Sequence, residues 1–163
     1  PLAETTWQGH GERRYDFNFL PVAGGLKGYA WAFPCLIGGE PHVNIGVYSV
    51  TMEGSSLGEL LRRESARLGT APSRIQAFPI HWYDRGATVG GPGVALVGDA
   101  AGVDPLMGEG ISYAFEYGRL AAEVLTAQRA RGSSDLSQYG DVVRRSWMGR
   151  KLTRLRLATR LFY

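Results

Sequence analysis

Three segments in the first third of the chain alternate hydrophobic and polar residues, which is typical of β-strands with one covered face. They comprise residues 14–20 (RYDFNFL), 28–34 (GYAWAFP) and 42–50 (HVNIGVYSV). Residues 38–41 (GGEP) suit a hairpin loop between the last two strands. Residues 1–14 are polar, and we expect them to be mobile or displaced from their native neighbours. The alternation therefore predicts an antiparallel sheet.

Helical spacing replaces the alternation at residues 55–68, where four leucines form one stripe. Ser55 or Ser56 is suited to cap this helix, and its glutamates and arginines are expected to form a solvated face. Residues 73–83 return as an extended segment, which Pro79 restricts to the edge of a sheet.

The second half of the chain reads as strand, loop and helices. After a Gly-Gly-Pro-Gly turn, the apolar run Val94–Val97 has the length and composition of a strand buried on both faces. A loop of small residues leads to a helix that begins near Gly110. The apolar residues that recur at helical spacing in it are Ile111, Ala114, Phe115, Gly118, Ala122 and Leu125. Residues 136–161 are predicted to form one long helix, capped by Ser134 or Asp135. Six of its residues are expected to face inward: Tyr139, Val142, Val143, Leu152, Leu155 and Leu161.

The loop between this strand and helix has the chemistry of a ligand site. Asp99 follows the end of the strand, where its carboxylate can accept hydrogen bonds from ligand hydroxyls. Glycines at 108 and 110 leave the first N–H groups of the helix uncovered, which favours an anion or an oxygen that gains negative charge. A reduced flavin is such a ligand. The loop is not a P-loop, because Glu109 stands where a lysine is needed, and it lacks the Rossmann G-x-G-x-x-G spacing.

Composition narrows the classes of function. Cys35 is the only cysteine and His10, His42 and His81 are scattered, so we expect neither an internal disulfide nor a metal site, and a cytoplasmic location. Residues 141–163 carry seven basic residues and one acidic residue, although the whole chain has a net charge of only +3. This local basicity does not indicate a nucleic-acid surface. It is compatible with a solvated helix face or with a peripheral contact to an anionic membrane.

A family resemblance rests on the loop. Gly98-Asp99-Ala100-Ala101-Gly102, Asp104-Pro105 and Gly108-Glu109-Gly110-Ile111 resemble the second FAD-contacting motif of the flavoproteins related to p-hydroxybenzoate hydroxylase, most closely its geranylgeranyl reductase branch. The resemblance implies that Asp99 holds the ribityl chain and that residues 105–111 lie along the isoalloxazine ring. The cofactor-binding residues it implies are Gly98, Asp99, Ala100, Ala101, Pro105, Gly108, Glu109, Gly110 and Ile111.

The same branch has a Tyr-x-Trp-x-Phe-Pro strand that contributes to the cavity for a prenyl chain. Tyr29, Trp31, Phe33 and Pro34 match it, so the resemblance implies substrate-binding roles for them. Tyr48 departs from the pattern, because a second glycine is usual there. Packing of the aromatic side chains into a core is the alternative interpretation.

These observations define the expected protein. We expect an α+β fold: an antiparallel, aromatic-faced sheet of a substrate domain (1–88), a strand–loop–helix of a Rossmann-like FAD-binding domain (89–131) and a basic C-terminal helix (132–163). Because no ADP-binding βαβ fingerprint is present, we expect a fragment of a larger two-domain flavoprotein.

The resemblance implies an FAD-dependent reductase acting on isoprenoid double bonds through reduced flavin. NAD(P)H or another donor would supply the electrons, and an apolar, prenyl-bearing molecule would be the substrate. A flavin monooxygenase or halogenase, and a non-catalytic lipid- or partner-binding module, remain alternatives. No residue is identified as a catalytic acid or base, and Tyr29, Cys35 or water are all eligible proton sources.

Overall fold

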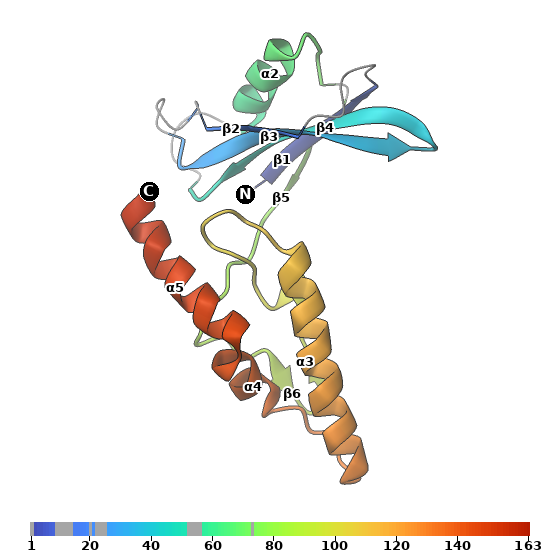
Figure 1. Ribbon diagram of the computed structural model, residues 1–163, viewed down its shortest axis with the longest axis vertical. Helices are drawn as coiled ribbons and strands as arrows, with labels where there is room; N and C mark the ends of the chain where they lie inside the picture. Colours follow the sequence, from blue (N-terminus) through green and yellow to red (C-terminus); the bar gives the residue numbers. More distant parts are fainter. Residues whose placement is uncertain (1, 9–14, 20, 22–25, 52–56, 73) are drawn as a thin grey trace. The chain divides into compact units, whose positions relative to one another are not determined.

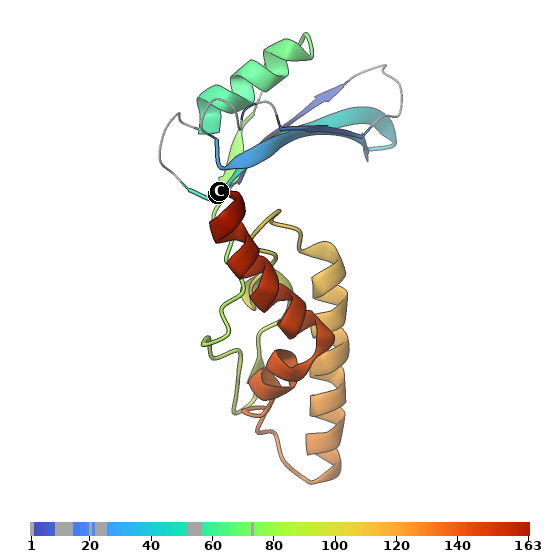
Figure 2. The same cartoon turned by 60° about the vertical axis from the view of Figure 1, so that its left-hand side comes forward.

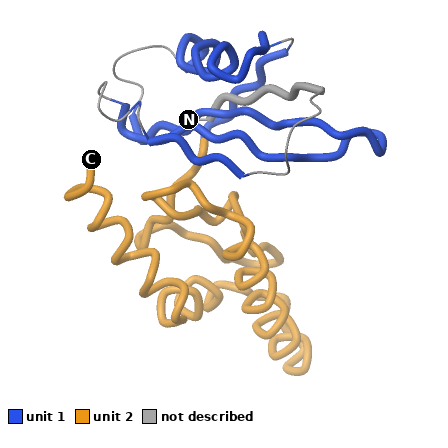
Figure 3. Tube along the Cα trace, turned by 45° about the horizontal axis from the view of Figure 1, so that its top comes forward, with its two compact units in different colours: residues 1–79 blue, residues 80–163 orange. Residues whose placement is uncertain are grey.

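A computed structural model describes residues 2–8, 15–19, 21, 26–51, 57–72 and 74–163, with only the backbone described for residues 2–8. The chain divides into two compact units, residues 1–79 and 80–163 (Figure 3).

The first unit is an antiparallel sheet with a helix on one face (Figures 1 and 2). Its strands are β1 (Leu2–Gln8), β2 (Asp16–Asn18), β3 (Gly28–Ile37), β4 (Glu40–Ser49) and β5 (Gln76–Phe78), in the order β2-β3-β4-β1-β5. The predicted antiparallel sheet is confirmed. Residues 2–8, for which we predicted no strand, form β1, which pairs with both β4 and β5. Residues 9–14 lie outside the described part.

A two-residue turn fixes the register of β3 and β4. Gly38 and Gly39 have φ angles of 60° and 87°, the left-handed conformation that a tight hairpin requires. Tyr29 is thereby paired with Tyr48, and Trp31 with Gly46. Because side chains alternate along a strand, these residues share one face of the sheet. On the other face Ala30, Ala32, Ile45 and Val47 are buried with Leu61 of the covering helix.

That helix, α2, spans Leu57–Arg67, and the serines predicted to cap it lie outside the described residues. Its polar residues are not all solvated, contrary to the prediction. Glu64 is buried and accepts hydrogen bonds from Asn18 Nδ2 to both carboxylate oxygens, at 2.9 and 3.0 Å. Arg67 donates to Asp16 at 2.8 Å and to Glu64 at 2.9 Å. The residues involved in this polar clamp lie far apart in sequence, so helical periodicity could not reveal it.

The second unit contains β6 (Gly90–Gly91), β7 (Val94–Ala95), the short 3-10 helix η1 (Gly98–Ala100), α3 (Ile111–Ala130), α4 (Tyr139–Arg145) and α5 (Trp147–Phe162). These elements share one core, so the boundaries at 88/89 and 131/132 do not separate compact units. Tyr83 and Val89 belong to this core, together with Leu136 and Val143 from the C-terminal segment. The division therefore falls between Pro79 and Ile80.

The strand predicted over residues 94–97 is shorter and more exposed than expected. Among the described residues β7 pairs only with β6, so its other edge has no neighbouring strand. Val94, Leu96 and Val97 consequently remain 56%, 38% and 42% exposed.

The helix predicted from this spacing is present as α3, but most of the residues that carried the spacing lie on its exposed face. Ile111 and Phe115 are 78% and 79% exposed, and Gly118, Ala122 and Leu125 are exposed as well. The buried residues are Tyr113, Tyr117, Leu120 and Val124, which also recur at helical spacing. The helix therefore has two apolar stripes, and packing within this unit covers the second one.

The single C-terminal helix that we predicted is two helices, broken at Ser146. This residue has extended backbone angles (φ −65°, ψ 164°), and its Oγ accepts a hydrogen bond from the N–H of Gly149 at 3.0 Å. A Cβ on Gly149 would lie 2.2 Å from the carbonyl oxygen of Val143, so the glycine lets the two helices approach closely. The break changes the helical phase, and Leu161, predicted to face inward, is 84% exposed.

Candidate functional site

The loop between β7 and α3 is held in place by residues 81–83. Val103 forms a parallel bridge with Trp82: the N–H of Val103 donates to the carbonyl of His81, and the N–H of Tyr83 donates to the carbonyl of Val103, both at 2.9 Å. Gly102 has a φ of 102°, and a Cβ there would lie 2.6 Å from the Cα of Tyr83. Only glycine permits this close approach, which fixes the middle of the loop.

Two buried side chains hold the rest of the loop. Tyr117 of α3 donates from its hydroxyl to the carbonyl of Gly102 at 2.9 Å, and burial raises its pKa. Asp104 is 6% exposed, and its Oδ1 accepts a hydrogen bond from the N–H of Leu106 at 2.7 Å. Burial raises the pKa of Asp104, although hydrogen bonds from the N–H groups of Leu106 and Met107 oppose the shift. Hydrogen bonds formed by these two buried side chains thus fix the conformation of the loop.

Asp99 and Gly110 meet at the start of α3. The carboxylate of Asp99 is exposed and has no hydrogen-bond or ion-pair partner in the described part of the chain. A Cβ on Gly110 would lie 2.6 Å from Asp99 Oδ1 and 3.1 Å from Val103 Cγ1, so the absence of a side chain lets the carboxylate lie against the helix end. An unpartnered acceptor therefore stands beside the positive end of the helix dipole.

The first amides of α3 are mostly open, as predicted. The N-cap is Gly110, which contributes no side-chain cap. In the described structure the N–H groups of Glu109, Gly110 and Ile111 have no hydrogen-bond acceptor. The N–H of Ser112 is the exception, because Oε1 of Glu109 accepts from it at 2.9 Å while Oε2 accepts from the Ser112 hydroxyl at 2.9 Å. Three N–H donors are thus open at the N-terminus of α3, where a negatively charged oxygen is favoured.

The predicted cofactor-binding residues come together here but differ in access. Asp99, Ala100, Glu109 and Ile111 are exposed, Gly108 and Gly110 are partly buried, and Gly98, Ala101 and Pro105 are buried. The side chains of Ala101 and Pro105 lie inside the unit. These two residues are buried as a whole, so in this structure they support the loop and offer no surface to a ligand.

Three of the predicted substrate residues, Tyr29, Trp31 and Phe33, lie on the aromatic face of the first unit. The rings of Tyr29 and Phe33 lie 5.8 and 6.1 Å from that of Trp31, and Tyr48 lies 5.7 Å from Tyr29. Pro34 does not belong to this row, because it is paired with Val43, which packs against the core under α2, and alternation therefore places it on the other face of the sheet. The row is continuous, and it lies on the face opposite α2.

The indole of Trp31 is fixed in position by β4. Its Nε1 donates to Asn44 Oδ1 at 2.7 Å. A Cβ on Gly46 would lie 2.0 Å from Trp31 Cζ2, so the ring lies directly over the glycine backbone.

Comparisons with known proteins agree with this geometry. No protein-family model matches the chain. Its sequence is 37% identical over 113 residues to menaquinone reductase of Mycolicibacterium smegmatis, matching 63% of this chain and 27% of that protein. It is 36% identical over 121 residues to the chloroplastic geranylgeranyl diphosphate reductase of Oryza sativa, matching 68% of this chain and 25% of that protein. The chain is a homologue of the geranylgeranyl reductases. The resemblance inferred from the loop is thereby confirmed.

The match to these reductases is partial in length. The chain spans about a quarter of the curated relatives that it matches. A solved structure of a geranylgeranyl bacteriochlorophyll reductase-like protein from Thermoplasma acidophilum superposes with a TM-score of 0.73 and 22% sequence identity. It covers 99% of this chain and 42% of that one, so the fold of nearly the whole chain recurs within a larger protein.

Three supporting residues of the candidate flavin loop were not assigned a structural role from the sequence. Gly102 was noted only for its small size, although it permits the contact with residues 81–83. Asp104 precedes a proline, a pairing that often initiates turns, and this signal could have identified it. The role of Tyr117 could not be predicted, because the helical spacing was traced through other residues of α3.

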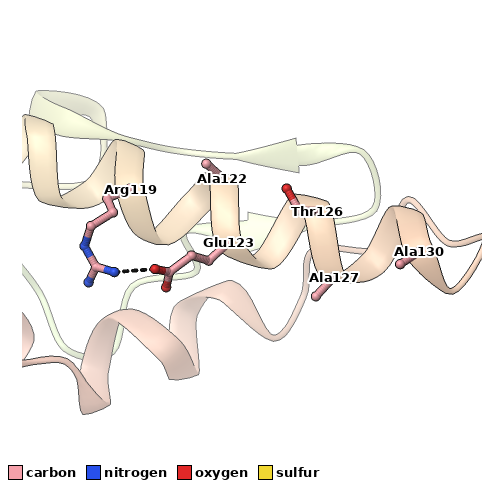
Figure 4. A pocket seen from close by; sticks show the side chains of 6 residues that line it. All are labelled: Arg119, Ala122, Glu123, Thr126, Ala127 and Ala130. Atoms are coloured by element: carbon pink, nitrogen blue, oxygen red, sulfur yellow. Dashed lines mark hydrogen bonds and ion pairs between the residues drawn. The ribbon is translucent and has the colours of Figure 1, made fainter.

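Two other places have less chemistry to offer. A shallow groove of about 560 Å³ lies along the C-terminal part of α3, lined by Arg119, Ala122, Glu123, Thr126, Ala127 and Ala130 (Figure 4). Its two charges form an ion pair with each other. Within the described residues no three His, Cys, Asp or Glu side chains form a potential metal site.

Proposed function

We propose that this protein is part of a flavin-dependent reductase that acts on an isoprenoid double bond. The observation that carries the proposal is the unpartnered Asp99 carboxylate beside the open amides of residues 109–111. The relatives support it, because geranylgeranyl diphosphate is an isoprenoid and menaquinone bears an isoprenoid chain.

The residues present fit FAD. Asp99 offers an acceptor for the hydroxyls of a ribityl chain, and the amides of residues 109–111 offer donors to a carbonyl oxygen that carries negative charge. Ala100 is exposed and has a small side chain, which would let a planar ring approach the backbone. Bound there, a flavin would supply hydride transfer to the substrate.

The chain's own contribution is binding and orientation. The loop amides would stabilise negative charge at the reduced ring, since they are fixed before the ligand arrives. Tyr29, Trp31 and Phe33 would hold an apolar chain, with Trp31 kept in place by Asn44. NAD(P)H or another donor would supply the electrons, and Tyr29, Cys35 or water the proton.

The test is the flavin affinity of the intact protein with Asp99→Asn. A hydrogen bond to a charged group contributes about 1.5–3 kcal/mol, so the Kd for FAD should rise roughly tenfold to hundredfold. Gly110→Ala should weaken binding too, because its Cβ would displace the carboxylate. Asp141→Asn is the matched control, since Asp141 is exposed and pairs only with Arg144 on α4.

Unchanged FAD affinity in both loop variants would refute the assigned site. Oxygen-dependent consumption of NAD(P)H by the intact protein would instead indicate a monooxygenase or halogenase. Lipid binding without any flavin in the intact protein would indicate a non-catalytic module.

We also propose a peripheral membrane contact through the end of α5. None of the helices in the described structure is long and apolar enough to cross a bilayer. Leu157, Leu161 and Phe162 are 62%, 84% and 64% exposed, and the exposed Arg154 and Arg160 lie on the same helix. This composition suits adsorption to an anionic surface. Flotation of the intact protein with anionic liposomes is the check.

A further inference from the structure

A second row of aromatic rings lies beside the proposed substrate residues. Phe17 of β2 is paired with Trp31 of β3, so it shares the aromatic face, and alternation puts Tyr15 and Phe19 on the same face. The Phe17 ring lies 4.9 Å from that of Phe33 and 5.9 Å from that of Tyr29. Tyr15 lies 5.6 Å from Phe33, and Phe19 lies 5.6 Å from Tyr29. The two rows therefore form one continuous apolar surface.

Exposure increases across this surface from β4 to β2. Tyr48 and Trp31 are 1% and 9% exposed, whereas Tyr15, Phe17 and Phe19 are 69%, 51% and 42% exposed. Three adjacent exposed rings are unusual on a protein surface unless something binds them. The rings of β2 are thus available to a ligand that the first row alone would only partly cover.

The opposite face of β2 explains how so short an edge strand is kept in place. Alternation directs Asp16 and Asn18 away from the rings, and both are held by α2. Asn18 donates to the buried carboxylate of Glu64, and Arg67 joins Glu64 to Asp16. These four residues, the polar clamp, attach a three-residue strand to a helix behind the sheet.

We propose that Tyr15, Phe17 and Phe19 bind the distal part of a long isoprenoid chain and that the polar clamp positions them. The inference rests on the proposed function and extends its substrate site from β3 to β2. Rows of rings accept hydrocarbon at any point along their length, so the second row adds apolar contact for additional isoprene units. It therefore selects for chain length, and the clamp residues are positioning residues.

The experiment measures binding of two probes to the intact protein: geranylgeraniol, with four isoprene units, and geraniol, with two. The variant Phe17→Leu/Phe19→Leu removes two rings but keeps apolar side chains. Its Kd for geranylgeraniol should rise about threefold to tenfold, while that for geraniol changes by less than about twofold. Trp147→Leu is the control, because Trp147 is 51% exposed, as Phe17 is, and lies in the other unit.

The clamp is tested without removing any ring. Asn18→Ala should give the same selective loss of geranylgeraniol affinity, with geraniol binding retained as a sign of an intact fold. Arg67→Met, at a partly exposed residue, is the milder second variant should Asn18→Ala prove unstable.

The outcomes separate this inference from the proposed function. Tight geranylgeraniol binding that is equal in the wild type and the Phe17→Leu/Phe19→Leu variant would overturn the role of β2 and leave the proposed function standing. Absence of any isoprenoid binding by the wild type would overturn both. Loss of liposome binding by the variant with unchanged geranylgeraniol affinity would show that the rings contact a membrane, which also overturns the inference.

Discussion

Gly46 lies directly beneath the indole of Trp31, and replacing it with alanine provides a severe test of the aromatic face. The added Cβ would lie 2.0 Å from Cζ2 and 2.3 Å from Cε2 of the ring. Real carbon atoms do not approach so closely, so the indole must move away from β4. This movement takes Nε1 away from Asn44 Oδ1, its acceptor at 2.7 Å.

The expected loss follows from these two effects. Forcing an extra carbon into a packed site costs about 1–3 kcal/mol, and the broken hydrogen bond about 1 kcal/mol more. The conformational gain of replacing glycine in a strand offsets about 0.5 kcal/mol. We therefore expect Gly46→Ala to lower the free energy of unfolding of the first unit by about 1.5–3.5 kcal/mol.

Denaturant titration followed by far-UV circular dichroism measures this loss. Gly58→Ala is the matched control: its Cβ would meet only Arg62 Nη1, at 3.8 Å among the described residues, on a helix. It should stabilise the unit by about 0.5–1 kcal/mol. In a Trp31→Phe background the smaller ring leaves room, so the Gly46→Ala loss should shrink by at least half. A Gly46→Ala variant as stable as the wild type would refute the ring position on which the substrate proposal depends.

Two further predictions concern the second unit. Because burial raises the pKa of Asp104 above its ordinary 3.8, the folded state binds this proton more tightly than the unfolded state, and the stability it contributes is lost as pH rises through the raised value. In thermal melts, the melting temperature of Asp104→Asn should therefore rise relative to that of the wild type between about pH 4 and pH 7. A difference between the two proteins that stays constant with pH would contradict this. Ile111→Ser/Phe115→Ser should change the unfolding free energy by no more than about 0.5 kcal/mol per residue, whereas Leu120→Ala should cost about 2–4 kcal/mol. The reverse order in denaturant melts would mean that the buried face of α3 is misassigned.

Local patterns predicted the elements whose causes are local. Residues 28–50 alternate and enclose a Gly-Gly turn, so β3 and β4 were predicted from sequence alone. Their register was not, because the predicted loop of residues 38–41 is a two-residue turn and Glu40 and Pro41 belong to β4. β1 was not predicted either, because its sequence LAETTWQ has few apolar residues and owes its pairing to strands on both sides. The break at Ser146 carried no proline or glycine at the break itself. Only the close packing of Gly149 against Val143 makes it intelligible.

The candidate flavin loop shows the same division between local and distant causes. The roles of its small residues and of Asp99 could be predicted from the sequence, because each acts through its own backbone or side chain. The supports come from elsewhere: residues 81–83 bridge to Val103, and Tyr117 reaches back to Gly102 from within α3. A sequence read segment by segment cannot reveal contacts between segments, which is why the loop was predicted and its supports were not.

Helix α3 joins these two levels of explanation. Periodicity alone could not choose between its two apolar stripes, because both recur at helical spacing, and a helix that is apolar on two sides is typical of a buried element. The stripe through Tyr117 was selected by the loop, since that hydroxyl satisfies the carbonyl of Gly102 while the ring fills the core. The same packing sets the axis of the helix, and with it the direction of the open amides at residues 109–111. The stripe that contains Tyr117 thus sets the direction of the N–H donors at the candidate site. A substitution of Tyr117 should therefore change the affinity of the proposed flavin site, although this side chain would not contact the ligand.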